Sequence, residues 1–270
     1  MKDPIRKFSI TNPNDQNQIP SVYYRANHMH KNSKNFVFFH GLTTDKNEYL
    51  DFYKNLALKL SALGNNILCF DARTHGESNA STDEFTVTNL ISDGIEAIKW
   101  LMQEEKIDKV TLFGTSFGAI PSICITNLLP NLIDQIFLLA PVLDFEKNYL
   151  APIIPQRAER YSSLKKVTLI DGKQFEITNK IAFTRNMIIE FALINLPEIL
   201  SQLSAEICIM HGTADTVIPY SINNEICNSL NIKLHTFENM DHGFMELDDD
   251  EGTSEESLEN IKRIINILIN

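Results

Sequence analysis

The feature that most constrains this chain is a short apolar run that ends in a serine between two glycines. Residues 110–113 are apolar or β-branched, which predicts a buried strand. The pattern Gly-x-Ser-x-Gly follows with its serine at Ser116, and residues 119–129 have the composition of a buried helix. A strand, a sharp turn and a helix would hold the Ser116 hydroxyl above a sheet in a strained conformation, with the N–H groups of the new helix beside it.

Strands and helices alternate along most of the chain. Apolar runs predict strands at 36–39, 67–70, 136–140, 207–210 and 233–237, and a further pair at 8–10 and 22–25. Apolar residues at helical spacing predict helices at 49–63, 90–102, 220–230 and 258–268. The alternation is typical of a mostly parallel sheet covered by helices on both faces. The sequence therefore predicts one large α/β domain.

The alternation stops between residues 143 and 203. In this segment, Val167–Ile177 predicts a β-hairpin around Asp171-Gly172, and residues 181–196 predict an apolar helix. Because the sheet pattern resumes at residue 207, we interpret the irregular middle as an insertion between two strands of the sheet.

Composition narrows the class of protein further. Of 270 residues, 43% are hydrophobic and 22% charged, as in an ordinary globular protein. No stretch approaches the ~20 apolar residues of a membrane span, and no apolar run follows the first residues, so we expect neither a membrane segment nor a signal peptide. The net charge of -11 argues against a nucleic-acid partner. Acidic residues gather at 246–251, where we expect a solvated loop.

The four cysteines form no CxxC pair and no Cys/His cluster. Each lies inside an apolar element, far from the others in sequence: Cys69, Cys124, Cys208 and Cys227. We therefore expect buried, reduced thiols and a cytoplasmic location, with no metal site.

Ser116 needs a base, because a serine hydroxyl is a poor nucleophile at neutral pH. Asp215 lies on the loop that follows the strand predicted at 207–210, and His242 lies on the loop that follows the strand predicted at 233–237. A histidine oriented by a carboxylate is the usual partner of a nucleophilic serine. Ser116, Asp215 and His242 are therefore the predicted catalytic residues.

Four other residues compete for these roles. Asp144 also follows a sheet strand and is the rival acid. His75 precedes the serine in the chain and suits a structural turn, His211 is interpreted as a turn residue beside Asp215, and His40 is expected to position backbone.

Five short patterns together resemble the α/β-hydrolase superfamily. They are His-Gly at 40–41, Asp-x-Arg-x-His-Gly-x-Ser at 71–78, Gly-x-Ser-x-Gly at 114–118, His-Gly-x-x-Asp at 211–215 and Asp-His-Gly-Phe at 241–244. Within this superfamily the chain is similar to cap-bearing bacterial esterases of the feruloyl (cinnamoyl) esterase and monoacylglycerol lipase kind. One departure is Thr74, where relatives more often carry glycine. The resemblance implies an α/β-hydrolase fold with residues 1–142 and 204–270 as its core and residues 143–203 as an inserted cap, or lid.

The resemblance also implies an oxyanion hole and a pocket. The backbone N–H groups of Leu42 and Phe117 are expected to stabilise the negative charge that forms on the carbonyl oxygen. The cap is expected to supply the substrate pocket, with an apolar and aromatic lining suited to an acyl or aryl-acyl group. Its candidate substrate-binding residues are Phe145, Tyr149, Phe183 and Met187.

The expected activity is hydrolysis of carboxylic esters with short to medium acyl or aryl-acyl groups, without a cofactor, on a small-molecule ester or acyl substrate. An acyl thioesterase acting on acyl-CoA or acyl-ACP, or a serine aminopeptidase-like enzyme, fits the same patterns. A catalytically silent binding protein on this fold is the non-enzyme alternative, although no triad member is missing. A homodimer is left open as the oligomeric state.

Overall fold

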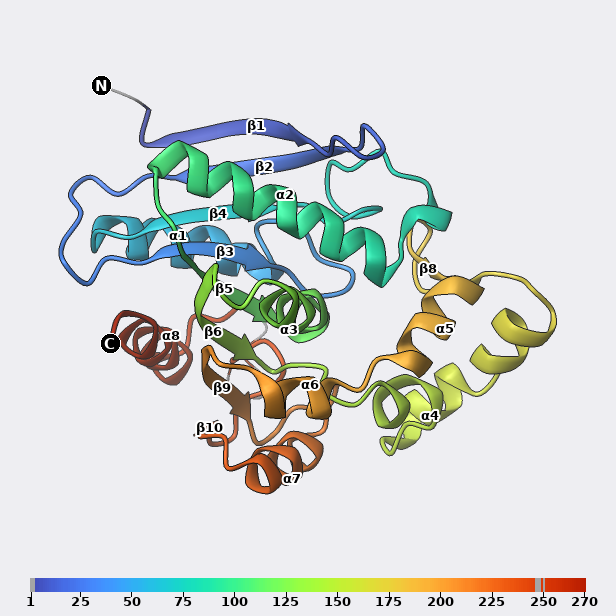
Figure 1. Cartoon of the computed structure of the whole chain (residues 1–270). Helices are drawn as coiled ribbons and strands as arrows, with labels where there is room; N and C mark the ends of the chain where they lie inside the picture. The colour runs from blue at the N-terminus through green and yellow to red at the C-terminus, as the bar shows by residue number, and fades with distance from the viewer. Residues whose placement is uncertain (1–2, 246–248, 250) are drawn as a thin grey trace.

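The computed structural model describes residues 3–245, 249 and 251–270, and it is built around one central sheet (Figure 1). Its eight strands lie in the order β1-β2-β4-β3-β5-β6-β9-β10. Their bounds are β1 Ile5–Thr11, β2 Gln18–Tyr24, β3 Asn35–Phe39, β4 Asn66–Phe70, β5 Val110–Thr115, β6 Ile133–Leu139, β9 Glu206–Gly212 and β10 Leu234–Phe237. Strand β2 is antiparallel to both of its neighbours. The other six neighbouring strands of this sheet run parallel to one another: β4, β3, β5, β6, β9 and β10. The prediction of a mostly parallel sheet is confirmed.

Helices cover both faces of this sheet. They are α1 Phe52–Ala62, α2 Val87–Glu105, α3 Ala119–Leu128, α6 Leu196–Gln202, α7 Tyr220–Leu230 and α8 Glu255–Ile269. Helices α2, α3, α6 and α7 pack on one face, and α1 and α8 pack on the other. Figure 1 shows α2 and α3 in front of the sheet and α1 behind it. The helices expected in the body of the protein are therefore present, with end residues shifted by a few positions.

Successive side chains of the central strands pack into two separate hydrophobic cores, one on each face of the sheet. In β3, Val37 packs into the cluster beneath α2 and α3, whereas Phe36 and Phe38 pack into the cluster beneath α1 and α8. Side chains alternate across a strand, so a strand that is apolar at every position can bury both faces. The strand register brings side chains of the same core together, because Val37 lies opposite Leu68 of β4 and Leu112 of β5, and all three belong to one cluster.

The chain leaves the sheet between β6 and β9. Here the elements are short: a π-helical turn over Glu146–Leu150, α4 Pro155–Tyr161, a second π-helical turn over Lys166–Ile170, β7 Phe175–Glu176, β8 Ala182–Phe183 and α5 Arg185–Leu193. Figure 1 shows α4, α5 and β8 grouped on the side of the sheet away from α1 and α8. Helix α5 contacts α2, which joins this segment to the body.

The hairpin expected over Val167–Ile177 is wrong. Part of that stretch is helical, because the Val167 N–H donates to Ser163 O at 2.8 Å and the buried Thr168 hydroxyl donates to Leu164 O at 2.8 Å. Antiparallel pairing joins β7 to β8 instead, and that pairing delays the expected helix until Arg185. The Asp-Gly pair indicated a turn correctly, since Gly172 has φ +67°. That turn ends a helical turn and does not join two strands.

Other expectations can be compared directly. All four cysteines are free and buried, as expected. No helix among the described residues is both long and apolar enough to cross a membrane. Of the acidic stretch at 246–251, residues 246–248 and 250 lie outside the described residues.

Candidate active site

Ser116 occupies a sharp turn between β5 and α3. Its backbone has φ 51°, in the left-handed region that side chains larger than glycine rarely adopt. A Cβ at Gly118 would lie 2.1 Å from the carbonyl oxygen of Phe39, and one at Gly114 would lie 2.7 Å from the Ser122 hydroxyl oxygen. Both glycines are therefore required by close approach of the neighbouring backbone and side chains. The turn holds the Ser116 hydroxyl at the end of the central strand.

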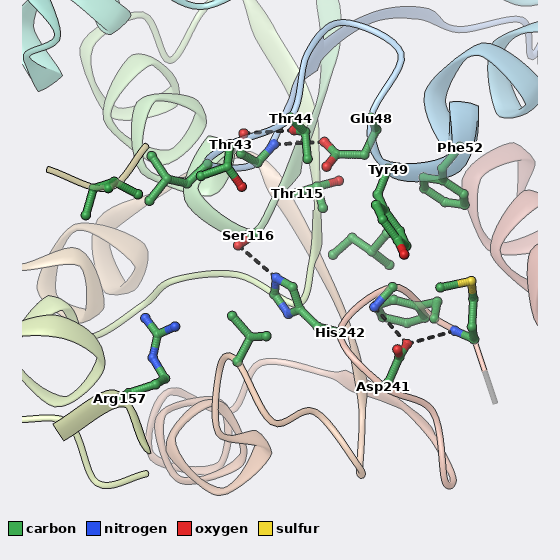
Figure 2. Close-up of a pocket in the computed structure, with 18 of the residues that line it drawn as sticks. Thr43, Thr44, Glu48, Tyr49, Phe52, Thr115, Ser116, Arg157, Asp241 and His242 are labelled. Atoms are coloured by element: carbon green, nitrogen blue, oxygen red, sulfur yellow. Dashed lines mark hydrogen bonds between the residues drawn. The ribbon is translucent and has the colours of Figure 1, made fainter. Parts of the chain in front are cut away.

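The loops after β9 and β10 bring Asp215 and His242 to this serine. His242 Nε2 lies 3.0 Å from Ser116 Oγ, and His242 Nδ1 lies 2.7 Å from Asp215 Oδ2. Figure 2 shows the imidazole directed at the Ser116 hydroxyl. Three residues that are far apart in sequence thus form one hydrogen-bonded chain. In this geometry the imidazole can accept the hydroxyl proton while the carboxylate holds the ring.

Asp215 is buried and accepts more hydrogen bonds than His242 alone supplies. Its Oδ1 accepts the backbone N–H groups of Val217 and Ile218, both at 2.8 Å. Its Oδ2 also lies 3.0 Å from His211 Nε2. Burial by itself would raise the pKa of Asp215, but the charges and hydrogen bonds of His242 and His211 outweigh it and hold that pKa well below its usual range. The carboxylate is therefore ionised at neutral pH.

His211 is a positioning residue that the sequence interpretation placed only in a turn. The Asn223 amide donates to His211 Nδ1 at 3.0 Å and to the Pro141 carbonyl oxygen at 2.7 Å. With Nδ1 acting as acceptor, the ring proton lies on Nε2, where it faces Asp215. His211 therefore fixes the carboxylate that in turn fixes His242. The spacing of four residues between His211 and Asp215 was the available signal.

The charge of His242 is set by opposing effects. Burial lowers the pKa of this imidazole, whereas the Asp215 carboxylate raises it, and the net result lies above the ordinary histidine value. Glu48 and Asp241 also contribute in the upward direction. The neutral form that can accept a proton from Ser116 therefore becomes populated at a higher pH than in an ordinary histidine.

Apart from His211, the rivals for these roles lie elsewhere. Asp144 Oδ1 accepts the backbone N–H of Lys147 at 2.9 Å, and its Oδ2 lies 3.6 Å from Lys147 Nζ. His75 Nε2 accepts the Thr43 N–H at 3.2 Å, and His40 Nε2 accepts the Ala72 N–H at 2.9 Å. Burial lowers the pKa of His40 to about 4 and that of His75 to about 3. Both histidines are therefore neutral groups that order loops, and Asp144 caps a local turn.

The loop after β3 also comes close to Ser116. A Cβ at Gly41 would lie 3.4 Å from Ser116 Cβ. The Gly41 carbonyl oxygen is held by His40 Nδ1 at 2.8 Å and by the Thr44 hydroxyl at 2.9 Å. Leu42 lines the pocket beside Ser116, and Phe117 follows Ser116 at the start of the helical turn. That the N–H groups of these two residues bind the oxyanion remains a prediction.

Glu48 is a site residue that no sequence pattern indicated. Its Oε2 accepts the Gly41 N–H at 2.8 Å, and a Cβ at Gly41 would lie 3.3 Å from its Oε1. Gly41 thus separates this carboxyl group from the nucleophile. Burial raises the pKa of Glu48 to about 7. Glu48 has φ 63°, and the nearby Leu50 and Asp51 also have positive φ. Backbone strain of this kind is often stored at functional sites.

These residues share a pocket of about 480 Å³. Ser116, His242 and Glu48 lie in its wall, as do Tyr149 and Arg157 from the segment between β6 and β9. Figure 2 shows Arg157 on the opposite side of the pocket from Glu48 and Tyr49. The pocket is large enough for a small-molecule substrate. Contrary to the apolar lining expected from the sequence, its walls carry several charged groups.

Only one of the four expected substrate-binding residues lines this pocket. Tyr149 does so, but Phe145, Phe183 and Met187 are buried elsewhere. Phe145 stacks on Phe191 with 3.4 Å between ring centroids, and Phe183 packs edge-on against Tyr149 at 5.4 Å. These apolar side chains bury more surface by packing the segment onto the body than by lining an open cavity. Among the described residues, no three His, Cys, Asp or Glu side chains gather to hold a metal.

Comparisons with known proteins agree with this architecture. A family model described as the alpha/beta hydrolase fold matches residues 34–170. No curated protein sequence matches the chain. Similar solved structures include Est1E from Butyrivibrio proteoclasticus with bound ferulic acid, which is 14% identical with a TM-score of 0.73 over 97% of this chain and 98% of that one.

Two further structures show the same likeness. The alpha/beta hydrolase GrgF from Penicillium sp. sh18 is 14% identical, with a TM-score of 0.69 over 98% of this chain and 99% of that one. An alpha-beta serine hydrolase homologue from Coxiella burnetii is 17% identical, with a TM-score of 0.61 over 97% of each chain. At these identities the structures show the fold alone. The family match and this fold together support hydrolase activity, and the chain belongs to the α/β-hydrolase fold family.

Proposed function

We propose that this protein is a serine hydrolase that cleaves carboxylic esters with short to medium acyl or aryl-acyl groups. The observation that carries the proposal is the hydrogen-bonded chain from Ser116 through His242 to Asp215 at the wall of an open pocket. A serine, a neutral imidazole and an ionised carboxylate in this order are what acyl transfer to a hydroxyl group requires.

The reaction would proceed in two halves. Ser116 Oγ attacks the ester carbonyl carbon while His242 Nε2 takes the hydroxyl proton, and the N–H groups of Leu42 and Phe117 would receive the oxyanion. The carbon–oxygen bond to the alcohol then breaks, and His242 gives the proton to the leaving oxygen. Water attacks the acyl-enzyme, passes a proton to His242, and releases the acid as Ser116 regains its hydrogen.

The segment over residues 143–203 is proposed to act as a cap on a core formed by residues 1–142 and 204–270. Tyr149, Arg157, Tyr161 and Ile177 support this role, because they belong to the segment and line the same pocket as Ser116. A cytoplasmic location is part of the same proposal and fits the four free, buried thiols.

Hydrolysis of p-nitrophenyl butyrate by the purified protein tests the proposal. We expect turnover by the wild type and its loss in Ser116→Ala, by several orders of magnitude in kcat. Ser201→Ala, which removes an exposed serine at the end of α6, is the matched control and should behave as the wild type. Activity that survives in Ser116→Ala would overturn the proposal. Faster turnover of acyl-CoA or aminoacyl anilides than of every ester tried would replace the substrate class.

A further inference from the structure

Two arginines line the pocket that holds Ser116 and His242. Arg157 and Arg160 both belong to α4, and their spacing of three residues places them on one face of that helix. Figure 2 shows the Arg157 guanidinium across the pocket from Glu48, with Ser116 and His242 between the two in this view. The proposed cap therefore contributes positive charge to the site, in addition to the tyrosines.

Arg157 is held in place by neutral groups. Its Nε and Nη2 donate to the Asn148 carbonyl oxygen at 3.3 and 3.1 Å. Its guanidinium lies over the Tyr149 ring at 4.9 Å and near the Tyr161 ring at 5.2 Å from the centroids. Stacking and one carbonyl orient the guanidinium plane without neutralising its charge. Part of the five-donor fork is left for a further acceptor.

Neither arginine forms an ion pair within the described part of the chain, whereas the buried Arg73 pairs with Asp93 at 2.7 Å. Asp241 and Asp249 line the same pocket, but both accept backbone N–H groups of their own loops, from Gly243 and Ser254 among others. A half-buried guanidinium without a counter-ion is costly, and an anionic ligand would offset that cost. Arg157 is the half-buried one of the two, and Arg160 is exposed, but in a protein with a net charge of -11 two arginines in one pocket wall are a specific local feature.

We propose that the pocket takes esters that carry a carboxylate group away from the scissile bond, and that Arg157 binds this carboxylate. The inference rests on the proposed function and names its substrate class. The planar fork of a guanidinium matches a carboxylate with two parallel hydrogen bonds. Arg160 adds a second positive charge at the same wall. Ser116 would then attack an ester carbonyl whose charged end is anchored on the cap.

A matched pair of esters tests the inference. The 4-nitrophenyl monoester of glutaric acid and 4-nitrophenyl valerate have acyl chains of equal length, and only the first ends in a carboxylate. We expect the wild type to prefer the glutarate ester in kcat/KM and to lose this preference as salt is added. In Arg157→Gln the ratio of the two kcat/KM values should fall roughly tenfold to hundredfold, the value of charge-assisted hydrogen bonds. Arg157→Lys should fall between the two.

Arg185→Gln is the control for this experiment. Arg185 belongs to the same segment but not to the pocket wall, and its Nε donates to the Thr168 carbonyl oxygen at 3.2 Å. This variant should keep the wild-type ratio. A second arm places the carboxylate on the alcohol side, with the butyrate ester of 4-hydroxybenzoate compared with 4-methylphenyl butyrate. If Arg157 is needed for a preference for the carboxylate in just one of the two arms, that arm shows whether the acyl part or the alcohol part of the ester carries the charge.

The possible failures differ in kind. Turnover of the valerate ester that requires Ser116, with no preference for a carboxylate in either arm and no effect of Arg157→Gln on the ratios, overturns the inference alone. Hydrolysis that persists in Ser116→Ala overturns the proposed function instead. Titration calorimetry with glutarate gives a readout without turnover. Binding by the wild type that weakens in Arg157→Gln supports the inference, and equal or undetectable binding by both proteins contradicts it.

Discussion

The body of this protein and the segment over residues 143–203 position their side chains by different means. In the body, Ser116, Asp215 and His242 follow strand ends, so the backbone ladder of one sheet fixes their relative positions. The segment has only short elements, joined to each other and to the body by stacked and edge-on aromatic rings. The comparison shows that the sheet fixes the relative positions of the three predicted catalytic residues. Side-chain packing within the segment decides which groups line the rest of the pocket.

The largest effect should come from breaking the chain of hydrogen bonds in the body. Asp215→Asn would favour the wrong tautomer of His242, and we expect kcat for p-nitrophenyl butyrate to fall by roughly 10⁴ with the fold retained. Asp144→Asn is the matched control, because it removes the rival carboxylate of the segment, and its effect should be much smaller. Circular dichroism checks the fold. The reverse ranking would assign the acid to Asp144 and contradict the geometry described above.

A smaller effect on chemistry should come from loosening the segment. Phe145→Ala removes a ring stacked between Phe191 and Tyr149, and truncation of a buried phenylalanine costs about 3–5 kcal/mol of stability. We expect faster proteolysis within 143–203 and an altered preference for acyl-chain length, while a small fluorophosphonate still reacts with Ser116.

Phe137→Ala is the counterpart in the body, because Phe137 is also buried but belongs to β6. This variant should lower the thermal midpoint of unfolding and fluorophosphonate reactivity together. If Phe145→Ala abolishes reactivity with the small probe as well, the two regions are not separable in the way proposed here.

The smallest effect expected is a shift in pH dependence. The activity kcat/KM should rise with pH as His242 loses its proton, because only the neutral imidazole accepts the proton of Ser116. Burial lowers the pKa of His242, and Asp215, Glu48 and Asp241 together raise it more, so the midpoint should lie above the reference value of ~6.5. Glu48→Gln removes the negative charge that Glu48 acquires as it ionises, with a pKa of about 7. The rising limb should then move to lower pH, by up to about one unit.

Two variants calibrate that shift. Asp241→Asn should move the limb in the same direction by less, since Asp241 contributes less than Glu48 to the raised pKa of His242. Glu225→Gln, on the exposed side of α7, should leave the limb in place. A limb that Glu48→Gln leaves unchanged would show that Glu48 orders Gly41 without acting on the charge of His242.

The body could be predicted from sequence because its signals are local. Continuous apolar runs marked the strands, and Ser116, Asp215 and His242 each followed one of them. The departure at Thr74 lies at a position where the backbone has φ 67°, which explains the glycine of relatives and disfavours a β-branched residue. Side-chain periodicity could not show which apolar residues of the segment face the pocket. Phe145 and Phe183 are aromatic residues of the kind that often line a pocket, but both are buried in the core.

Glu48 could not be found for a related reason. Its position depends on positive φ angles at Glu48, Leu50 and Asp51, and no glycine marks that stretch. Its partner, the Gly41 N–H, belongs to a short pattern that predicts a turn but not the carboxylate that accepts from it. His211 was visible as part of a pattern, but its contact with Asp215 follows from the tautomer that Asn223 imposes.

The measurement that tests the central claim most directly is the site of covalent labelling. The wild type is treated with a fluorophosphonate, digested with trypsin and sequenced by mass spectrometry. The adduct should lie on the peptide 110–147, with fragment ions placing it on Ser116 and not on Ser122 of the same peptide. Ser116→Ala should remain unlabelled, and Asp215→Asn should label far more slowly. An adduct on Ser122 or on any other residue, or equal labelling of Ser116→Ala, would contradict the account.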